Sequence, residues 1–135
     1  HGLKLLQRSG VDLGIISGRD SECTRTRARE LGIDLLYQGI KDKMVPFEEI
    51  MVQRGLRADE IAYVGDDLPD IPILLRVGFA ATVADALEVV KGHVHYVAKR
   101  PGGRGAVREI CDLILHQSGK WDGVTARYFA RDGHG

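Results

Sequence analysis

Three carboxylates follow a short apolar run near the middle of the chain. Asp66, Asp67 and Asp70 come directly after Gly65 and the run Ile61–Val64. Hard cations such as Mg²⁺ bind one or two protein carboxylates together with water and phosphate oxygens. The spacing therefore predicts a Mg²⁺ site in which Asp66 and Asp70 are the protein ligands. In the alternative interpretation, the three acids only cap the helix that follows, although one helix start needs one acidic side chain.

A hydroxyl and an ammonium group occur at comparable places. Ser17 follows the strand predicted over 11–16, and Lys43 comes soon after the strand predicted over 34–37. A hydroxyl can donate to a phosphoryl oxygen, while an ammonium group and a cation neutralise the charge that develops in phosphoryl transfer. These residues therefore predict a phosphate site. Taken singly, each has a simpler interpretation: Ser17 as a turn residue and Lys43 as a solvated surface charge.

The segments that would position these residues alternate between strand and helix. Strands are predicted over 11–16, 34–37, 61–64, 79–83 and 94–97. Helices are predicted over 2–9, from Asp20 or Ser21 to Gly32, over 43–53, over 71–77, over 86–91 after a cap at Asp85, and over 103–117. This alternation favours an α/β fold, a doubly wound parallel sheet. Ligands bind outside the carboxyl ends of the strands in such sheets, so Ser17, Lys43 and Asp66 are expected at one crevice.

Length, charge and composition predict one soluble domain. The chain has 135 residues, 44% of them hydrophobic, and carries nineteen basic and nineteen acidic side chains. Without net charge there is no overall attraction to nucleic acid or to a lipid surface, and no apolar run is long enough to span a bilayer. The chain begins at His1 inside a predicted helix, which we interpret as the start of a fragment.

The cysteines and two of the histidines do not form a predicted metal site. Cys23 and Cys111 lie in predicted helices without metal-ligand spacing, which is typical of small core residues in a reducing compartment. His93 and His95 alternate on a predicted strand without a third ligand. We interpret both histidines as surface residues of an edge strand.

Glycines and basic side chains follow the last predicted strand. In Pro101-Gly-Gly-Arg-Gly105, glycines precede a helix and leave backbone N–H groups able to approach an anion. Arg104 adds a planar fork suited to a carboxylate or a phosphate. The surrounding basic cluster consists of Lys99, Arg100, Arg104 and Arg108. This cluster suits an acidic substrate better than a nucleic acid duplex, and a flexible connection to the helix is an equally good interpretation of the glycines.

Four segments together carry a family resemblance. They are Ile15-Ile-Ser-Gly-Arg19, Tyr37-Gln-Gly-Ile-Lys-Asp-Lys43, Tyr63-Val-Gly-Asp-Asp-Leu-Pro-Asp70 and Pro101-Gly-Gly-Arg-Gly-Ala-Val-Arg-Glu109. Through Leu115 the chain resembles the haloacid dehalogenase-like phosphatases, and among them the small capless 3-deoxy-D-manno-octulosonate 8-phosphate phosphatase family. The resemblance implies a Mg²⁺-dependent hydrolase of sugar acid phosphates in lipopolysaccharide biosynthesis that forms a cytoplasmic homotetramer.

The resemblance also implies a role for each matching residue. Ser17 would bind a phosphoryl oxygen, Lys43 would hold the phosphate and the nucleophile, and Asp66 would ligate Mg²⁺ with support from Asp70. The substrate-binding residues would be Arg19, Gly102, Gly103 and Arg104.

One feature of the family is absent from this sequence. Family members begin with a strand that carries Asp-x-Asp-Gly, whose first aspartate attacks phosphorus and whose second protonates the leaving alcohol, and these 135 residues contain no such motif. We therefore expect a core over 1–118 that lacks its first strand, with two unpaired sheet edges, poor folding and no turnover by itself. In the tail over 119–135, Trp121, Tyr128 and Phe129 are expected at a subunit interface, or else in a frayed terminus.

Two other classes of function remain open. A related haloacid dehalogenase-like domain is fused to acylneuraminate cytidylyltransferases, where it serves assembly and not catalysis. A phosphoacceptor receiver domain also uses an aspartate, a hydroxyl and a lysine in its site. The order along the chain argues against a receiver, because here the acidic pair follows Lys43, whereas receivers place their acidic residues earlier.

Overall fold

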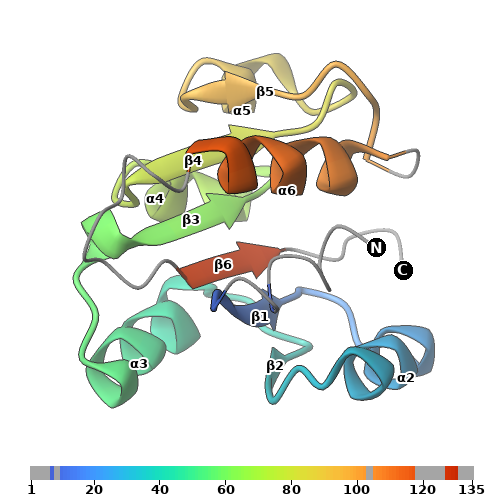
Figure 1. The fold of residues 1–135 in the computed structure, drawn as a ribbon, viewed down its shortest axis with the longest axis vertical. Helices are drawn as coiled ribbons and strands as arrows, with labels where there is room; N and C mark the ends of the chain where they lie inside the picture. The colour runs from blue at the N-terminus through green and yellow to red at the C-terminus, as the bar shows by residue number, and fades with distance from the viewer. Residues whose placement is uncertain (1–6, 8–9, 103–104, 118–126, 131–135) are drawn as a thin grey trace.

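The strands of the molecule form one parallel sheet with helices on both faces (Figure 1). The computed structural model describes residues 7, 10–102, 105–117 and 127–130. The strands are β1 (Asp12–Ile16), β2 (Leu35–Tyr37), β3 (Ile61–Val64), β4 (Phe79–Thr82), β5 (Tyr96–Val97) and β6 (Arg127–Ala130). Their order in the sheet is β2-β1-β6-β3-β4-β5, and every neighbouring pair is parallel. The predicted α/β fold with a parallel sheet is confirmed.

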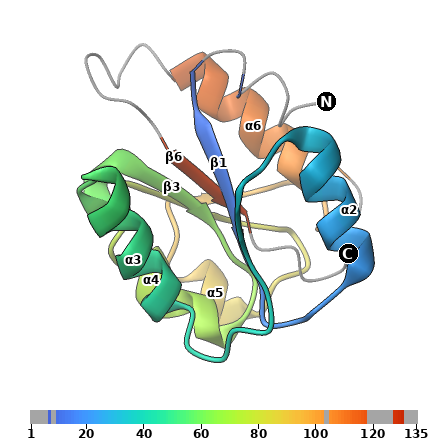
Figure 2. The ribbon, with the colours of Figure 1, turned by 90° about the horizontal axis from the view of Figure 1, so that it is seen from below.

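The helices divide between the two faces of the sheet (Figure 2). They are α2 (Glu22–Leu31), α3 (Met44–Arg54), α4 (Ile71–Leu74), α5 (Glu88–Lys91) and α6 (Ala106–Gln117), with short 3₁₀ turns η1 (Ala58–Glu60) and η2 (Leu68–Asp70). Helices α2 and α6 cover one face, and α3, α4 and α5 cover the other. None of the helices within the described residues combines the length and the apolar composition needed to cross a membrane.

Strand β3 shows how both faces of the sheet are buried. Ala62 and Val64 belong to the core cluster that α2 and α6 cover, whereas Ile61 and Tyr63 belong to the cluster beneath α3, α4 and α5. All four residues are buried. A strand covered on both faces appears in the sequence as a continuous apolar run, which is why the run over 61–64 indicated a central strand.

The start of α2 is set by its local sequence. Ser21 has an extended backbone, and its side chain accepts a hydrogen bond from the backbone N–H of Thr24 at 3.3 Å. The helix closes at Gly32, whose φ of 69° is left-handed and therefore favours glycine. Of the two predicted caps, Asp20 and Ser21, the structure uses Ser21.

Strand β6 corrects the expected gap in the sheet. It lies between β1 and β3 and pairs with both, with Arg127 opposite Asp12 and Ile61. The prediction of two unpaired edges is therefore wrong for these strands. Two facing strands with free N–H and C=O groups can be bridged by any extended segment, and the Arg-Tyr-Phe-Ala sequence includes two aromatic residues that favour strands. The glycines and charges around 127–130 hid this signal, and Trp121 lies outside the described residues.

Three further expectations differ from the structure. Helix α4 ends at Leu74, before the predicted boundary. Asp85 does not cap α5, whose N-cap is Leu87; its carboxylate instead accepts a hydrogen bond from the backbone N–H of Gly102 at 2.9 Å. Cys111 is a core residue as expected, but Cys23 is exposed, because it lies on the outer side of α2. Most of the helix predicted over 2–9 lies outside the described residues.

Candidate functional site

Three of the predicted site residues follow strands at the carboxyl edge of the sheet. Ser17 comes directly after β1 and is 1% exposed, Lys43 lies between β2 and α3 and is 2% exposed, and the half-buried Asp66 follows β3. Because all strands are parallel, these positions lie at the same edge, as the sequence indicated. The interpretation of Lys43 as a solvated surface charge is wrong.

A buried ion pair connects Lys43 to the acidic segment. The Nζ of Lys43 donates to the Oδ1 of Asp70 at 2.8 Å, and the hydroxyl of Tyr63 donates to the same oxygen at 2.7 Å. All three side chains lie in the interior of the molecule. A buried charge is tolerated when it is paired and hydrogen-bonded. The contacts to Asp70 therefore explain how the ammonium group of Lys43 can be buried at this edge of the sheet.

The second oxygen of Asp70 holds the loop that carries Asp66. Its Oδ2 accepts hydrogen bonds from the backbone N–H groups of Asp66 at 3.0 Å and Asp67 at 3.2 Å. The side chain of Asp67 caps η2 by accepting from the N–H of Leu68 at 2.7 Å. The three acids therefore have different tasks: Asp67 caps the turn, Asp70 anchors the loop and Lys43, and Asp66 lies at the end of the anchored loop.

The close approach of Asp70 to the strand end requires a glycine. A Cβ atom at Gly65 would lie 2.4 Å from the Cβ of Asp70 and 2.6 Å from its Cγ, which is closer than real side chains come. The glycine after β3 thus leaves room for the carboxylate that holds the next two amides.

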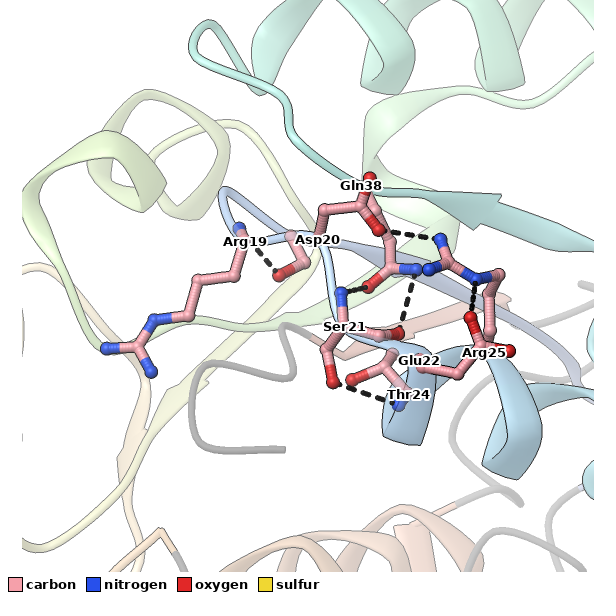
Figure 3. A network of polar contacts seen from close by, with 8 residues as sticks. Arg19, Asp20, Ser21, Glu22, Thr24, Arg25 and Gln38 are labelled. Atoms are coloured by element: carbon pink, nitrogen blue, oxygen red, sulfur yellow. Dashed lines mark hydrogen bonds and ion pairs between the residues drawn. The ribbon is translucent and has the colours of Figure 1, made fainter.

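The loops after β1 and β2 are joined by hydrogen bonds. The N–H of Ser17 donates to the carbonyl of Tyr37 at 2.8 Å. The side-chain amide of Gln38 contacts both backbone groups of Ser21, accepting from its N–H at 2.9 Å and donating to its C=O at 3.3 Å (Figure 3). The N–H of Arg19 donates to the Oγ of Ser17 at 3.1 Å. These contacts fix the backbone from which the Arg19 side chain extends, away from the Ser21 and Gln38 network in Figure 3.

The same view contains an ion-pair cluster that faces solvent. Arg25 contacts Asp20 at 2.6 Å and Glu22 at 2.9 Å (Figure 3). The hydrogen bonds that Arg25 donates to Asp20 and Glu22 raise the pKa of Arg25. Because the cluster is exposed, its contribution to stability is small.

A second carboxylate holds the segment that follows β5. Glu109 of α6 accepts hydrogen bonds from the backbone N–H groups of Lys99 at 2.9 Å and Arg100 at 3.2 Å, and from the hydroxyl of Tyr96. Burial of the Glu109 carboxyl opposes its ionisation, but the Tyr96 hydroxyl and the two N–H groups outweigh burial, so the pKa of Glu109 lies below its ordinary value. The hydrogen bond to Glu109, together with burial, raises the pKa of Tyr96. Gly103 and Arg104 lie outside the described residues.

The remaining predicted polar positions have local partners. The exposed His93 and His95 precede β5. The Nδ1 of His95 accepts a hydrogen bond from the N–H of Ala80 at 2.8 Å, and the Nδ1 of His93 lies 2.7 Å from the carbonyl oxygen of Val89.

Thr82 at the end of β4 is fully buried. In the part of the chain that the structure describes, its hydroxyl is the one buried side-chain polar atom that lacks a hydrogen-bond partner.

The donor groups at the sheet edge fit Mg²⁺ better than a metal that needs a full protein cage. Among the described residues, no group of three or more His, Cys, Asp and Glu side chains could hold a metal ion. Mg²⁺ keeps several waters and binds one or two carboxylates together with substrate phosphate. A half-buried Asp66, on a loop fixed by Asp70, meets that smaller requirement.

Sequence reasoning missed two residues that organise this edge. Tyr63 was assigned only to the apolar strand, although a tyrosine in a fully buried strand needs a partner for its hydroxyl, and that need was a usable signal. Glu109 lay within a recognised segment, but its partners lie nine to thirteen residues before it, across a loop whose path the sequence does not specify.

Comparisons of sequence find relatives of known activity. No protein-family model matches the chain. The 3-deoxy-D-manno-octulosonate 8-phosphate phosphatase of Yersinia pestis is 43% identical over 125 residues, which are 93% of this chain and 67% of the relative. The phosphatase of the same name from Escherichia coli strain K12 is 39% identical over 122 residues, which are 90% of this chain and 65% of the relative. The chain thus spans about two thirds of the length of these curated relatives.

Solved structures show the same similarity. The crystal structure of the Yersinia pestis phosphatase matches with a TM-score of 0.84 at 43% identity, over 93% of this chain and 68% of that chain. The phosphatase of Moraxella catarrhalis, crystallised with a magnesium ion, a phosphate ion and a KDO molecule, matches with a TM-score of 0.84 at 39% identity, over 90% of this chain and 70% of that chain.

Proposed function

Because the chain belongs to the 3-deoxy-D-manno-octulosonate 8-phosphate phosphatase family, we propose that it forms the phosphate-binding part of a Mg²⁺-dependent phosphatase of sugar acid phosphates. The observation that carries the proposal is the buried contact between Lys43 and Asp70 at 2.8 Å, next to the loop of Asp66. It supports the proposal because one buried carboxylate holds both the positive charge of Lys43 and the backbone of Asp66, at the edge where parallel sheets bind ligands.

Each residue has a defined task in this proposal. The hydroxyl of Ser17 binds a phosphoryl oxygen, and the ammonium group of Lys43 neutralises the charge that develops on the phosphoryl group. Asp66 is the protein ligand of Mg²⁺, which when bound acts as a Lewis acid on the phosphate. Asp70 supports the site by holding Lys43 and the amide of Asp66, a role for which its four hydrogen bonds are better suited than direct metal ligation.

Substrate recognition is assigned to residues around the phosphate site. Arg19 extends from a backbone that Ser17 and its neighbours fix, and Gly102 is held by Asp85. We include Gly103 and Arg104 on the family resemblance alone. The homotetramer has the same support, whereas the cytoplasmic location is also favoured by the cysteine usage, and both stay predictions.

Turnover in the family also needs a carboxylate nucleophile and a proton donor. The Asp-x-Asp-Gly segment that supplies both in the family does not occur in these 135 residues. We therefore propose turnover for a protein that contains this segment together with the present chain, and none for residues 1–135 alone.

The test compares the chain alone with a form extended by the Asp-x-Asp-Gly strand of the Yersinia pestis relative. Phosphate release from 3-deoxy-D-manno-octulosonate 8-phosphate is measured with Mg²⁺. The extended form should turn over, and Asp66→Asn should reduce its rate by about a hundredfold or more, as expected when transition-state charge loses its stabilisation. Asp34→Asn, at an exposed position away from this edge, is the matched control.

Two outcomes would contradict the proposal. Full activity of Asp66→Asn at ordinary Mg²⁺ concentrations would remove Asp66 as the metal ligand. A folded extended form without turnover would favour the assembly domain of a cytidylyltransferase instead.

A further inference from the structure

The segment over 98–102 is held in place by hydrogen bonds along its whole length. It leaves β5 at the carboxyl edge of the sheet. The N–H of Ala98 donates to the carbonyl of Thr82 at 2.8 Å, and the carbonyl of Arg100 accepts from the N–H of Ala84 at 3.1 Å. Both contacts tie the segment to the strand and turn of β4.

Two carboxylates complete this set of contacts. Glu109 accepts from the successive N–H groups of Lys99 and Arg100, and Asp85 accepts from the N–H of Gly102 at 2.9 Å. A carboxylate that accepts several backbone hydrogen bonds makes stronger contacts than a neutral acceptor. The segment is therefore preorganised before any ligand arrives.

The segment also carries two exposed positive charges. The side chains of Lys99 and Arg100 are exposed, while their backbone amides are bound by Glu109. A Cβ atom at Gly105 would lie 3.3 Å from the Cδ of Arg100, so the Arg100 side chain packs closely over that glycine. Any anion at this segment would meet the side-chain cations, because Glu109 already takes the two amides.

The distance between this segment and the phosphate site suits the proposed substrate. Strand β5 lies two positions from β3, which is about 10 Å at the usual strand spacing. In 3-deoxy-D-manno-octulosonate 8-phosphate, the carboxylate and the phosphate are at opposite ends of an eight-carbon chain. With the phosphate beside Asp66, the carboxylate end can reach toward β5.

From these contacts we infer that Glu109 is a positioning residue for substrate specificity, which fixes Lys99 and Arg100 where they meet the carboxylate end of the sugar acid. The inference rests on the proposed function, since it takes its substrate from there. Tyr96 assists by donating its hydroxyl hydrogen bond to the same carboxylate. Glu109 itself does not touch the substrate.

The experiment measures binding to residues 1–135 by calorimetry with Mg²⁺ present. The two probes are the free sugar acid 3-deoxy-D-manno-octulosonate and inorganic phosphate. Glu109→Gln should weaken sugar acid binding about tenfold, the equivalent of about 1.4 kcal/mol, and leave phosphate affinity within about twofold. Tyr96→Phe keeps the carboxylate and should weaken sugar acid binding about two- to threefold. Glu49→Gln, exposed on α3, is the matched control.

A double-mutant cycle separates positioning from a general loss of stability. In a background of Lys99→Ala and Arg100→Ala, Glu109→Gln should cause no further loss of sugar acid affinity, because the cations that it positions are gone. Hydrogen exchange at the amides of residues 99 and 100 should accelerate in Glu109→Gln. This exchange shows that the contact was broken in the variant.

The outcomes distinguish the inference from the proposed function. Faster exchange with unchanged sugar acid affinity would overturn the inference and leave the proposed function intact. An equal loss of affinity for both probes, or an undiminished effect of Glu109→Gln in the background of Lys99→Ala and Arg100→Ala, would likewise overturn it. If the unmodified chain binds phosphate but no sugar acid, the proposed substrate is wrong and the inference falls with it.

Discussion

Lys43 and Asp70 lie 27 positions apart in the chain and form an ion pair in which 1% and 0% of the side chains are exposed. The same carboxylate accepts from the amides of Asp66 and Asp67. The cation proposed to hold phosphate and the loop proposed to hold Mg²⁺ therefore share one anchor. A displacement of Asp70 would move both at once.

Removing the cation should destabilise the fold as well as the site. Lys43→Met keeps the length of the side chain but leaves the Asp70 carboxylate without its charged partner. Breaking one side of a buried pair costs about 3–5 kcal/mol. We expect a loss near the lower end, because Tyr63 and two amides still donate to the carboxylate. Urea unfolding of residues 1–135 measures the change.

Lys41→Met is the matched control for this substitution, since Lys41 is exposed two residues earlier. Its free energy of unfolding should change by less than about 0.5 kcal/mol. A loss for Lys43→Met as small as that of the control would show that the pair is not formed in solution.

The glycine before Asp66 should tolerate no side chain. Gly65→Ala would bring a methyl group within 2.4 Å of the Cβ of Asp70, so the loop must shift and lose its amide contacts. We expect a loss of about 2–4 kcal/mol in thermal or urea unfolding. Gly92→Ala serves as control, because its added Cβ would come no closer than 3.7 Å to Val89 and its φ of −72° suits alanine. An equal effect of both substitutions would contradict the crowding at Gly65.

The unpartnered hydroxyl of Thr82 should reduce stability. Thr82→Val replaces it with a methyl group of similar shape and ends the penalty for burying an unsatisfied polar group. We expect the free energy of unfolding to rise by about 1 kcal/mol. Thr24→Val in α2 should instead lower it, because the buried Thr24 has a polar partner. A clear loss of stability in Thr82→Val would reveal a hydrogen bond to water or to a bound group.

Acid should weaken the contact between α6 and the segment after β5. The pKa of Glu109 is lower in the folded protein than its ordinary value, so the contact stabilises the fold above that ordinary value, and the contribution is lost as the pH falls through the folded pKa. In Glu109→Gln, the decline in stability as the pH falls below the ordinary carboxyl pKa of 4.5 should be shallower than in the unmodified chain. Urea unfolding across this range measures both slopes.

At alkaline pH, stability should fall as the pH rises, which is the opposite of its change at acid pH. The pKa of Tyr96 is raised in the folded protein, so its hydrogen bond stabilises the fold below the ordinary pKa of 10.0 and the contribution is lost as the pH rises through the folded value. Tyr96→Phe should remove this part of the alkaline decline. Parallel slopes for the variants and the unmodified chain would show that these two groups do not titrate differently on folding.

The edge of the sheet that carries the site was predictable because strand ends have sequence signals. An apolar run predicts a strand, and the polar residue directly after the run marks its carboxyl end. Ser17 follows one such run, and Gly65 and Asp66 follow another. The contacts that the site residues make with one another were harder to predict. That Asp70 would contact Lys43 and Tyr63 depends on the packing of α3 against α4, and contacts between distant residues have no local pattern.

Strand β6 shows the same limit at the level of the fold. Its residues favour an extended conformation, but nothing near them in the sequence indicates pairing with β1 and β3. The place of a strand in a parallel sheet depends on which neighbours are available, and a single short segment does not encode that information.

The position of β6 also affects how residues 1–135 fold. Among the described strands, β1 and β3 do not pair with each other, so within this part of the chain residues 127–130 join the half-sheet of β2 and β1 to the half-sheet of β3, β4 and β5. When residues 1–135 fold by themselves, the strand at 127–130 must pair with β1 and β3 across long stretches of chain, and such pairings form slowly. Until that pairing forms, the facing edges of β1 and β3 are exposed, which makes the partly folded chain prone to aggregation.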